Sequence, residues 1–302
     1  MKEVHNKIVI AVSSRALFDL EEENRIFEEE GRDAYATYQE THEDVMLKPG
    51  IAFPLVKALD KLNDVGNTKI DILLVSRNEA DTSLRIFNSI KHYNLNIERA
   101  ALIGEGSMIK YLKAFQTDLF LSAYEEDVQD AIDADIAAGI ICGCSKLQIL
   151  PEESLDEIRI AFDGDAVIFS DESEKIYKAE GVEAFNRHEQ ENAKVPLPEG
   201  PFAKILKLIS SIQKEFPRNE APIKTALVTS RSIQANERVI RTFRAWGVRV
   251  DESFFLGGVH KRDILKAFGA NIFFDDQKVH TDLASEKVPT ARVLYKQMCD
   301  EI

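Results

Sequence analysis

A shift of 150 residues aligns IAFDGDAVIFSDESEKIYKAEG (160–181) with IAVSSRALFDLEEENRIFEEEG (10–31). Further along, a shift of 153 residues aligns ILKAFGANIFFDD (264–276) with YLKAFQTDLFLSA (111–123), without a gap. Similarity of a chain to itself at a nearly constant spacing indicates a repeated structural unit. The 302 residues therefore predict two units of ordinary domain size, each able to bury a core of its own.

The two predicted units, residues 1–150 and 151–302, differ at a set of acids and one lysine. The second unit has Asp163, Asp165, Lys261, Asp275 and Asp276 where the first has Ser13, Arg15, Met108, Ser122 and Ala123. This difference predicts one chemical site in the second unit and a degenerate counterpart in the first. We expect the boundary between the units near 140–157, where a proline and several acids follow one another.

Both units repeat one order of predicted elements. Each begins with a short β-branched run, 7–12 or 157–162, of the kind that forms strands buried on both faces. Three further strands alternate with helices, and the last predicted strands are 118–122 and 271–276. This alternation predicts a mostly parallel sheet with helices on both faces, the doubly wound α/β class.

Composition excludes several kinds of partner. The formal net charge of −14 disfavours binding to nucleic-acid backbones and to anionic membranes. No apolar run reaches the roughly 18 residues that span a bilayer, and the N-terminal stretch lacks a signal-peptide pattern. Three cysteines, Cys142, Cys144 and Cys299, form neither a disulfide framework nor a metal-binding pattern. Such sparse cysteine usage is typical of a reducing compartment, so we expect a cytoplasmic protein.

Polar residues follow all four predicted strands of the second unit. In chain order they are Asp163 and Asp165, Thr229 and Ser230, Lys261, and Asp275 and Asp276. The carboxyl ends of parallel strands face one crevice, so these side chains are expected to converge. Converging carboxylates repel one another unless a cation lies among them, and oxygen ligands suit Mg²⁺. The hydroxyls and Lys261 suit phosphate oxygens, and Arg231 begins a predicted helix whose N-terminus favours an anion.

These motifs resemble those of the haloacid dehalogenase superfamily of phosphohydrolases. Asp163 and Asp165 match its DxD signature, Thr229 its Ser/Thr motif, Lys261 its lysine, and FFDDQ (273–277) its acidic motif. Longer strings, such as FDGDAVIFSDESEKIY, ALVTSRS and PGIAFPLVKAL, are similar to the cytosolic 5′-nucleotidase I family over about 8–280. Ala166-Val167 follows Asp165, and Val167 stands two places after the second aspartate, where the superfamily frequently has a Thr or Val.

The resemblance implies Mg²⁺-dependent hydrolysis of a nucleoside 5′-monophosphate, AMP first among them. Asp163 would attack phosphorus and form an aspartyl-phosphate, and Asp165 would serve as general acid and then as base. The metal would bind Asp163, Asp165 through its backbone carbonyl, and Asp275 or Asp276. Lys261 would be both catalytic and phosphate-binding, together with Thr229 and Ser230.

The long segment 171–222 is expected to form a helical cap over the cleft, because it is too long for a turn. Its candidates for contacts with base or ribose are Tyr177, Phe185, Arg187 and His188. Side chains at helical spacing also commonly pack in the core, which is the alternative for each of them.

Other functions remain open from the sequence. The chain could be a phosphatase for another small phosphomonoester, or a non-enzymatic nucleotide-binding regulatory protein. In the first unit, strand ends carry Arg15, Arg77 and Asn78. They predict an anion pocket for an effector, a surface that completes the active cleft or an oligomer interface, or a purely structural half. The residues do not determine the preference for base and sugar, or which member of the Asp275–Asp276 pair binds the metal. They also leave open whether the chain forms a homo-oligomer.

Overall fold

The computed structural model describes residues 7–64, 67–104, 106–143 and 157–296. The first half contains β1 (Lys7–Val12), α1 (Ser14–Leu17), β2 (Phe18–Asp19), α2 (Glu21–Glu30), α3 (Arg32–Thr41), β3 (Lys48–Pro49), α4 (Phe53–Lys61), η1 (Leu62–Asp64), β4 (Lys69–Ser76), α5 (Leu84–His92), β5 (Arg99–Leu102), α6 (Ile109–Ala114), β6 (Leu119–Ser122), α7 (Glu125–Asp133) and β7 (Ala137–Cys142). The second half contains β8 (Ile158–Phe162), η3 (Gly164–Ile168), α8 (Glu172–Glu191), α9 (Ala203–Gln213), β9 (Ile223–Thr229), η4 (Ile233–Ala235), α10 (Asn236–Trp246), β10 (Glu252–Phe255), α11 (Arg262–Phe268), β11 (Ile272–Asp275), α12 (Lys278–Ser285) and β12 (Thr290–Arg292).

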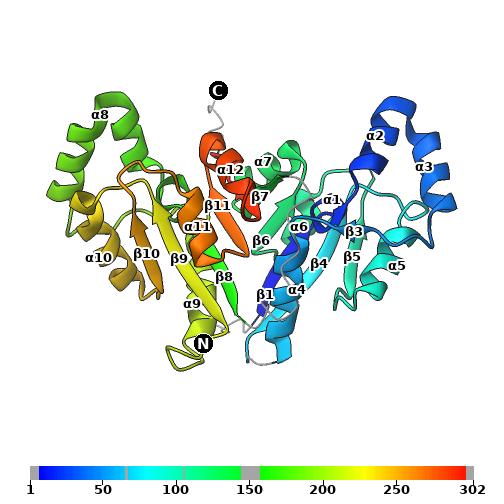
Figure 1. The fold of residues 1–302 in the computed structure, drawn as a ribbon, viewed down its shortest axis with the longest axis horizontal. Helices are drawn as coiled ribbons and strands as arrows, with labels where there is room; N and C mark the ends of the chain where they lie inside the picture. The colour runs from blue at the N-terminus through cyan, green and yellow to red at the C-terminus, as the bar shows by residue number, and fades with distance from the viewer. Residues whose placement is uncertain (1–6, 65–66, 105, 144–156, 297–302) are drawn as a thin grey trace.

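One ten-stranded sheet runs through both halves, with helices packed outside it (Figure 1). Its order is β10-β9-β8-β11-β12-β7-β6-β1-β4-β5. Every neighbouring pair is parallel except β12 and β7, which pair antiparallel at the centre. Counted inward from the two edges of the sheet, each strand of the first half has the same place as the strand about 150 residues later in the chain. The predicted α/β class with a mostly parallel sheet is confirmed.

The sheet has one more strand in each half than the sequence predicted. β7 and β12 follow the strands that were expected to be the last, and they join the halves through the register Ala291↔Ile141. β12 has only three residues, which is too short for a recognisable pattern of apolar residues. Its pairing with β11 on one side and β7 on the other provides the hydrogen bonds that hold it.

The two halves share a core, where the sequence suggested that each could bury its own. The main cluster of buried apolar residues takes members from both halves. Leu55 and Leu59 of α4 lie around one small apolar cavity with Ile205 and Ile209 of α9. α9 therefore covers the sheet, although it lies within the segment 171–222 that was expected to be a cap.

Two helical projections rise above opposite ends of the sheet, α8 at the upper left and α2–α3 at the upper right (Figure 1). They bend at matching glycines, Gly181 with φ of 83° and Gly31 with φ of 86°. Glycine adopts this left-handed conformation without the steric penalty of a Cβ atom, so each acidic helical stretch turns there.

Within the described ranges, no helix is both long and apolar enough to cross a bilayer. Cys142 ends β7 and is half-buried. Cys144 and Cys299 lie outside the described residues, and so does most of the expected boundary, at 144–156.

Candidate active site

Three carboxylates meet at the ends of two neighbouring strands. Asp163 follows β8 directly. Asp275 ends β11 and Asp276 follows it, and β11 is paired with β8 in parallel. All three residues are buried, and each offers an oxygen atom within 4.8 Å of the others. The Asp163 N–H donates to the carbonyl of Phe274 at 2.8 Å, which holds the start of the DGD loop against β11. Parallel pairing thus brings together acids that are distant in the sequence.

Lys261 lies between two of these acids. Its Nζ is 2.8 Å from Asp163 Oδ1 and 2.7 Å from Asp275 Oδ2, and its side chain is 1% exposed. Burial alone would lower the pKa of Lys261, but the two carboxylates raise it overall. Burial alone would raise the pKa of Asp275, but Lys261 and His280 lower it overall. The Gln277 N–H donates to Asp275 Oδ1 at 2.8 Å, so both oxygens of Asp275 are engaged.

One lysine does not balance three buried carboxylates. Burial raises the pKa of Asp276 to about 8, and the charges of Asp163 and Asp275 act in the same direction. Burial also raises the pKa of Asp163 to about 6, although Lys261 opposes the shift. Asp276 Oδ2 accepts from the Tyr295 hydroxyl, whereas Asp276 Oδ1 is buried and has no hydrogen-bond partner among the described residues. Uncompensated acids and an oxygen without a donor fit a divalent cation, and this all-oxygen set suits Mg²⁺.

Thr229 ends β9, on the other side of β8, and its hydroxyl lies beside the DGD loop. A Cβ atom at Gly164 would lie 3.4 Å from Thr229 Oγ1, so the loop passes close to that hydroxyl. Thr229 is buried, and its Oγ1 accepts from the Arg231 N–H at 3.2 Å. Ser230 follows it and is half-buried.

The carboxylate of Asp165 does not join the three acids. Arg231 Nε donates to Asp165 Oδ2 at 2.8 Å, and Arg231 Nη2 donates to Oδ1 at 2.6 Å. The sequence predicted that the Asp165 carboxylate converges with the other acids while its backbone carbonyl binds the metal, and it placed Arg231 at an anion site. In the structure the planar guanidinium occupies both oxygens of Asp165, which leaves neither group free for those contacts.

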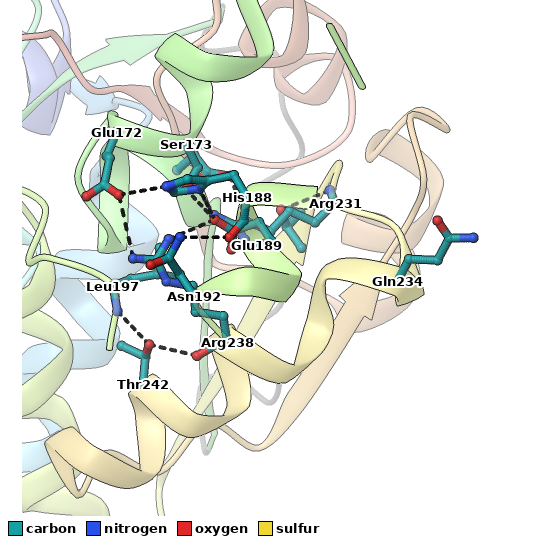
Figure 2. Close-up of polar contacts among 12 residues, drawn as sticks. Glu172, Ser173, His188, Glu189, Asn192, Leu197, Arg231, Gln234, Arg238 and Thr242 are labelled. Carbon is teal, nitrogen blue, oxygen red and sulfur yellow. Dashed lines mark hydrogen bonds and ion pairs between the residues drawn. The ribbon is translucent and has the colours of Figure 1, made fainter. Parts of the chain in front are cut away.

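Arg231 belongs to a buried ion-pair network centred on Glu189 of α8 (Figure 2). Arg231 Nη1 donates to Glu189 Oε2, and Arg238 Nη1 donates to Glu189 Oε1 at 2.9 Å. The Ser173 hydroxyl also donates to Oε1, at 2.8 Å. Burial opposes ionisation of Glu189, but Arg231, Ser173 and Arg238 lower its pKa overall. The network therefore fastens α8 to the segment that follows β9.

Replacement of Glu189 by alanine is expected to lower the free energy of unfolding by about 3 kcal/mol, because two buried arginines lose the buried carboxylate that they share. Urea unfolding monitored by circular dichroism measures the change. The neighbouring Gln190 is exposed, so Gln190→Ala should stay within about 0.5 kcal/mol of the wild type. Equal stability of the two variants would show that the network does not hold α8.

The four predicted ligand-contacting residues of α8 have different surroundings. Tyr177 is 53% exposed and meets the ring of Phe185 edge-on, with centroids 6.3 Å apart. Phe185 is buried, and the Arg231 guanidinium lies 5.1 Å from its ring centroid. His188 lies 3.4 Å from Glu172 and is part of the network in Figure 2, whereas Arg187 is exposed. Of the two aromatic residues, Tyr177 is the one left accessible.

Glu189, Arg238 and Tyr295 were not predicted as site residues. Acids in helix-forming stretches are usually solvated, and only the packing of α8 buries Glu189. One signal was present in the sequence, because the shift of 153 residues aligns Arg238 with another arginine, Arg85. In the structure Arg85 is also buried, and it pairs with Glu23 at 2.6 Å.

The chain matches a known protein family over nearly all of its length. A profile of the family described as 5′-nucleotidase matches residues 1–300. The chain is also 40% identical over 289 residues to human "Cytosolic 5′-nucleotidase 1B", and the alignment covers 92% of this chain and 47% of the human protein. The chain thus spans about half the length of this curated relative. Because the family match runs through both halves and every strand end that carries a buried acid, the chain belongs to the 5′-nucleotidase family.

Proposed function

We propose that this chain is a Mg²⁺-dependent 5′-nucleotidase that hydrolyses nucleoside 5′-monophosphates, with AMP as the first candidate. The observation that carries the proposal is the buried group of Asp163, Asp275 and Asp276 with Lys261 between two of its members. Membership of the 5′-nucleotidase family and the name of the human relative support the substrate class.

In the proposed mechanism, Asp163 attacks phosphorus, the bond to the 5′-oxygen breaks, and an aspartyl-phosphate forms. Asp165 gives a proton to the leaving oxygen and later takes one from the water that cleaves the intermediate. Arg231 holds both oxygens of Asp165. To act as general acid, Asp165 must therefore take up a proton and release one of its two contacts with Arg231. Lys261, Thr229 and Ser230 hold the phosphoryl oxygens.

Asp163 and Asp276 are the best candidates to hold the metal. Asp276 has an oxygen without a partner among the described residues, whereas Lys261 and the Gln277 N–H occupy both oxygens of Asp275. Asp275 would then position Lys261, and the Asp165 backbone carbonyl would complete the protein ligands. When bound, Mg²⁺ would offset negative charge on the attacking carboxylate and the phosphoryl oxygens.

Arg231 would be a positioning residue that holds Asp165 in one orientation. Arg231→Lys is expected to lower kcat by about 10- to 100-fold with little change in KM, because one ammonium cannot grip Asp165 and Glu189 together. Steady-state phosphate release measures both constants. Arg241 is exposed and pairs with Glu237 on α10, so Arg241→Lys is a matched control that should leave kcat unchanged. An unaltered kcat for Arg231→Lys would remove Arg231 from the mechanism.

We further propose that residues 1–150 and 151–302 are copies of one unit, each related to the haloacid dehalogenase fold. The matching order of strands about the β7–β12 pair supports this division. Of the segment 171–222, the part that would act as a cap is α8, since α9 packs in the core.

The human relative is named cytosolic, and this supports the proposal of a cytoplasmic enzyme. The net charge of −14 supports a small-molecule substrate rather than nucleic acid or membrane as partner. Formation of a homo-oligomer stays a prediction.

Assays of phosphate release in buffer with Mg²⁺ test the proposal. The panel of substrates contains nucleoside monophosphates, deoxynucleotides and sugar phosphates. AMP or another nucleoside 5′-monophosphate should be the best substrate. A preference for sugar phosphates would favour a phosphatase for another phosphomonoester and keep the mechanism. If no compound released phosphate, the enzyme proposal would fail, and a nucleotide-binding regulatory protein would be the remaining alternative.

A further inference from the structure

A cavity in the first half occupies the place that the acid cluster has in the second half. Its volume is about 270 Å³, and the ends of β1 and β4 line it together with α2 and α3. The residues that decide its chemistry are Ser13, Arg15, Phe27, Tyr35, Ser76 and Asn78. The shifts of 150 and 153 residues align them with Asp163, Asp165, Tyr177, Phe185, Thr229 and Arg231. The cavity is therefore the counterpart of the candidate active site with different side chains.

The first half has no carboxylate at the three positions aligned with the acid cluster. Ser13, Ser122 and Ala123 stand where the second half has its acids, and Met108 replaces the lysine. Arg15 stands where the second half has Asp165. The two carboxylates that line the cavity, Glu23 and Glu79, are paired with Arg85 and Arg32, so no cation is needed before the cavity can accept an anion.

Arg15 is available to such an anion. Its guanidinium donates to Asn24 Oδ1 at 3.0 Å and pairs with Glu21 at 3.2 Å. Glu21 is 72% exposed, so this pair is weak and easily exchanged. Arg15 Nε is buried and has no hydrogen-bond partner within the described part of the chain. A phosphate oxygen would satisfy that donor and strengthen the contact through its charge.

The mouth of the cavity has an aromatic pair, Phe27 and Tyr35, at the positions that align with Tyr177 and Phe185 of the second half. Phe27 is 51% exposed and meets the ring of Tyr35 edge-on, with centroids 5.7 Å apart and planes at 86°. Tyr177 is 53% exposed and meets Phe185 at 6.3 Å and 85°. Both halves thus offer an exposed aromatic face beside a polar floor, which suits a ligand with an aromatic ring and a polar group.

The wall of the cavity adds a hydrogen-bond donor. The Tyr35 hydroxyl accepts from Asn78 Nδ2 at 2.5 Å and from Gln39 Nε2 at 3.0 Å. These contacts occupy both lone pairs of the hydroxyl, so its hydrogen remains to be donated. The described residues form no hydrogen bond in which this hydroxyl is the donor. An oxygen or ring nitrogen of a ligand would fill that role.

We propose that the first-half cavity binds a nucleoside monophosphate without a divalent cation and without hydrolysing it. Phe27 contacts the base, Tyr35 donates to it or to the sugar, and Arg15 binds the phosphate. Hydrolysis does not follow, because Ser13 and Arg15 replace the nucleophile and the general acid. The choice of nucleotide rests on the proposed function of the second half.

Equilibrium dialysis of AMP against the full chain carrying Asp163→Asn, in excess EDTA, tests the proposal. One saturable site per chain is expected. Adding Phe27→Ala should weaken AMP binding about tenfold, while the matched change Tyr177→Ala in the second half should leave it unchanged. Adding Arg15→Met should weaken AMP about tenfold and leave adenosine binding as it was. Thermal unfolding confirms that each variant is folded, as the exposure of Phe27 leads us to expect.

Two results would overturn the proposal. The first is the lack of saturable AMP binding in EDTA. The second is a site that responds to Tyr177→Ala and not to Phe27→Ala, since the nucleotide would then occupy the second half. If Arg15→Met weakened adenosine as much as AMP, the assignment of the phosphate to Arg15 would be wrong. Phosphate release by the wild-type chain tests the proposed function separately, so either idea can fail alone.

Discussion

Replacement of Asp163 by asparagine is expected to reduce phosphate release from AMP by at least about 10⁴-fold, because the amide cannot serve as the nucleophile. Asparagine keeps the size of the side chain, and Lys261 keeps its contact with Asp275 at 2.7 Å. The variant should therefore fold and still bind nucleotide. A sensitive assay of phosphate release over hours, with a mock-purified control, measures the residual rate.

Two further measurements test this prediction. Residual activity within about tenfold of the wild type would assign the nucleophile elsewhere. The reverse graft, Ser13→Asp with Arg15→Asp in the Asp163→Asn protein, should restore nothing. The first half also has Met108, Ser122 and Ala123 at the aligned positions, so two new carboxylates do not rebuild the site.

Chelation of divalent cations is expected to abolish phosphate release, and added Mg²⁺ to restore it. Three buried carboxylates face one lysine, and burial already raises the pKa of Asp276 to about 8. Without a divalent cation, the carboxylates are partly protonated or repel the negatively charged phosphate. With one, the charges of the cation and Lys261 balance those of the three carboxylates. Release of phosphate in EDTA, followed by titration with MgCl₂, measures the requirement.

Asp276→Asn should raise the Mg²⁺ concentration for half-maximal activity by at least about tenfold, because it replaces the proposed metal ligand. The matched control is Asp282→Asn, an acid-to-amide change at an exposed residue that pairs with Lys278. This control should leave the Mg²⁺ requirement unchanged. Full activity in EDTA would contradict a metal-dependent mechanism, and an unaltered Mg²⁺ titration for Asp276→Asn would move the ligand role to Asp275.

The sequence alone determined the class of fold and the edge of the sheet that carries the polar residues. Short runs of apolar residues alternate with helical stretches, and this local pattern is enough to predict a mostly parallel sheet. Asp163, Thr229 and Asp275 could be located because each directly follows or ends a predicted strand, and such ends meet in one crevice.

Other features depended on contacts between segments far apart in the chain. The short strand β12 exists because β11 and β7 pair with it, and no pattern within three residues could reveal this. α9 lies with α8 in the segment that was expected to be a cap, yet its apolar face is buried with α4 from the other half. The shared core therefore became visible only in three dimensions.

The roles of individual side chains in the site were also decided by tertiary structure. Asp163 and Asp165 look alike in the sequence, but Lys261 lies beside the first, and Arg231 binds both oxygens of the second. Asp275 and Asp276 are adjacent, yet only Asp276 has a buried oxygen without a partner among the described residues. A residue's position along a strand follows from local periodicity, whereas the partners of its charged atoms depend on which distant groups the fold buries beside them.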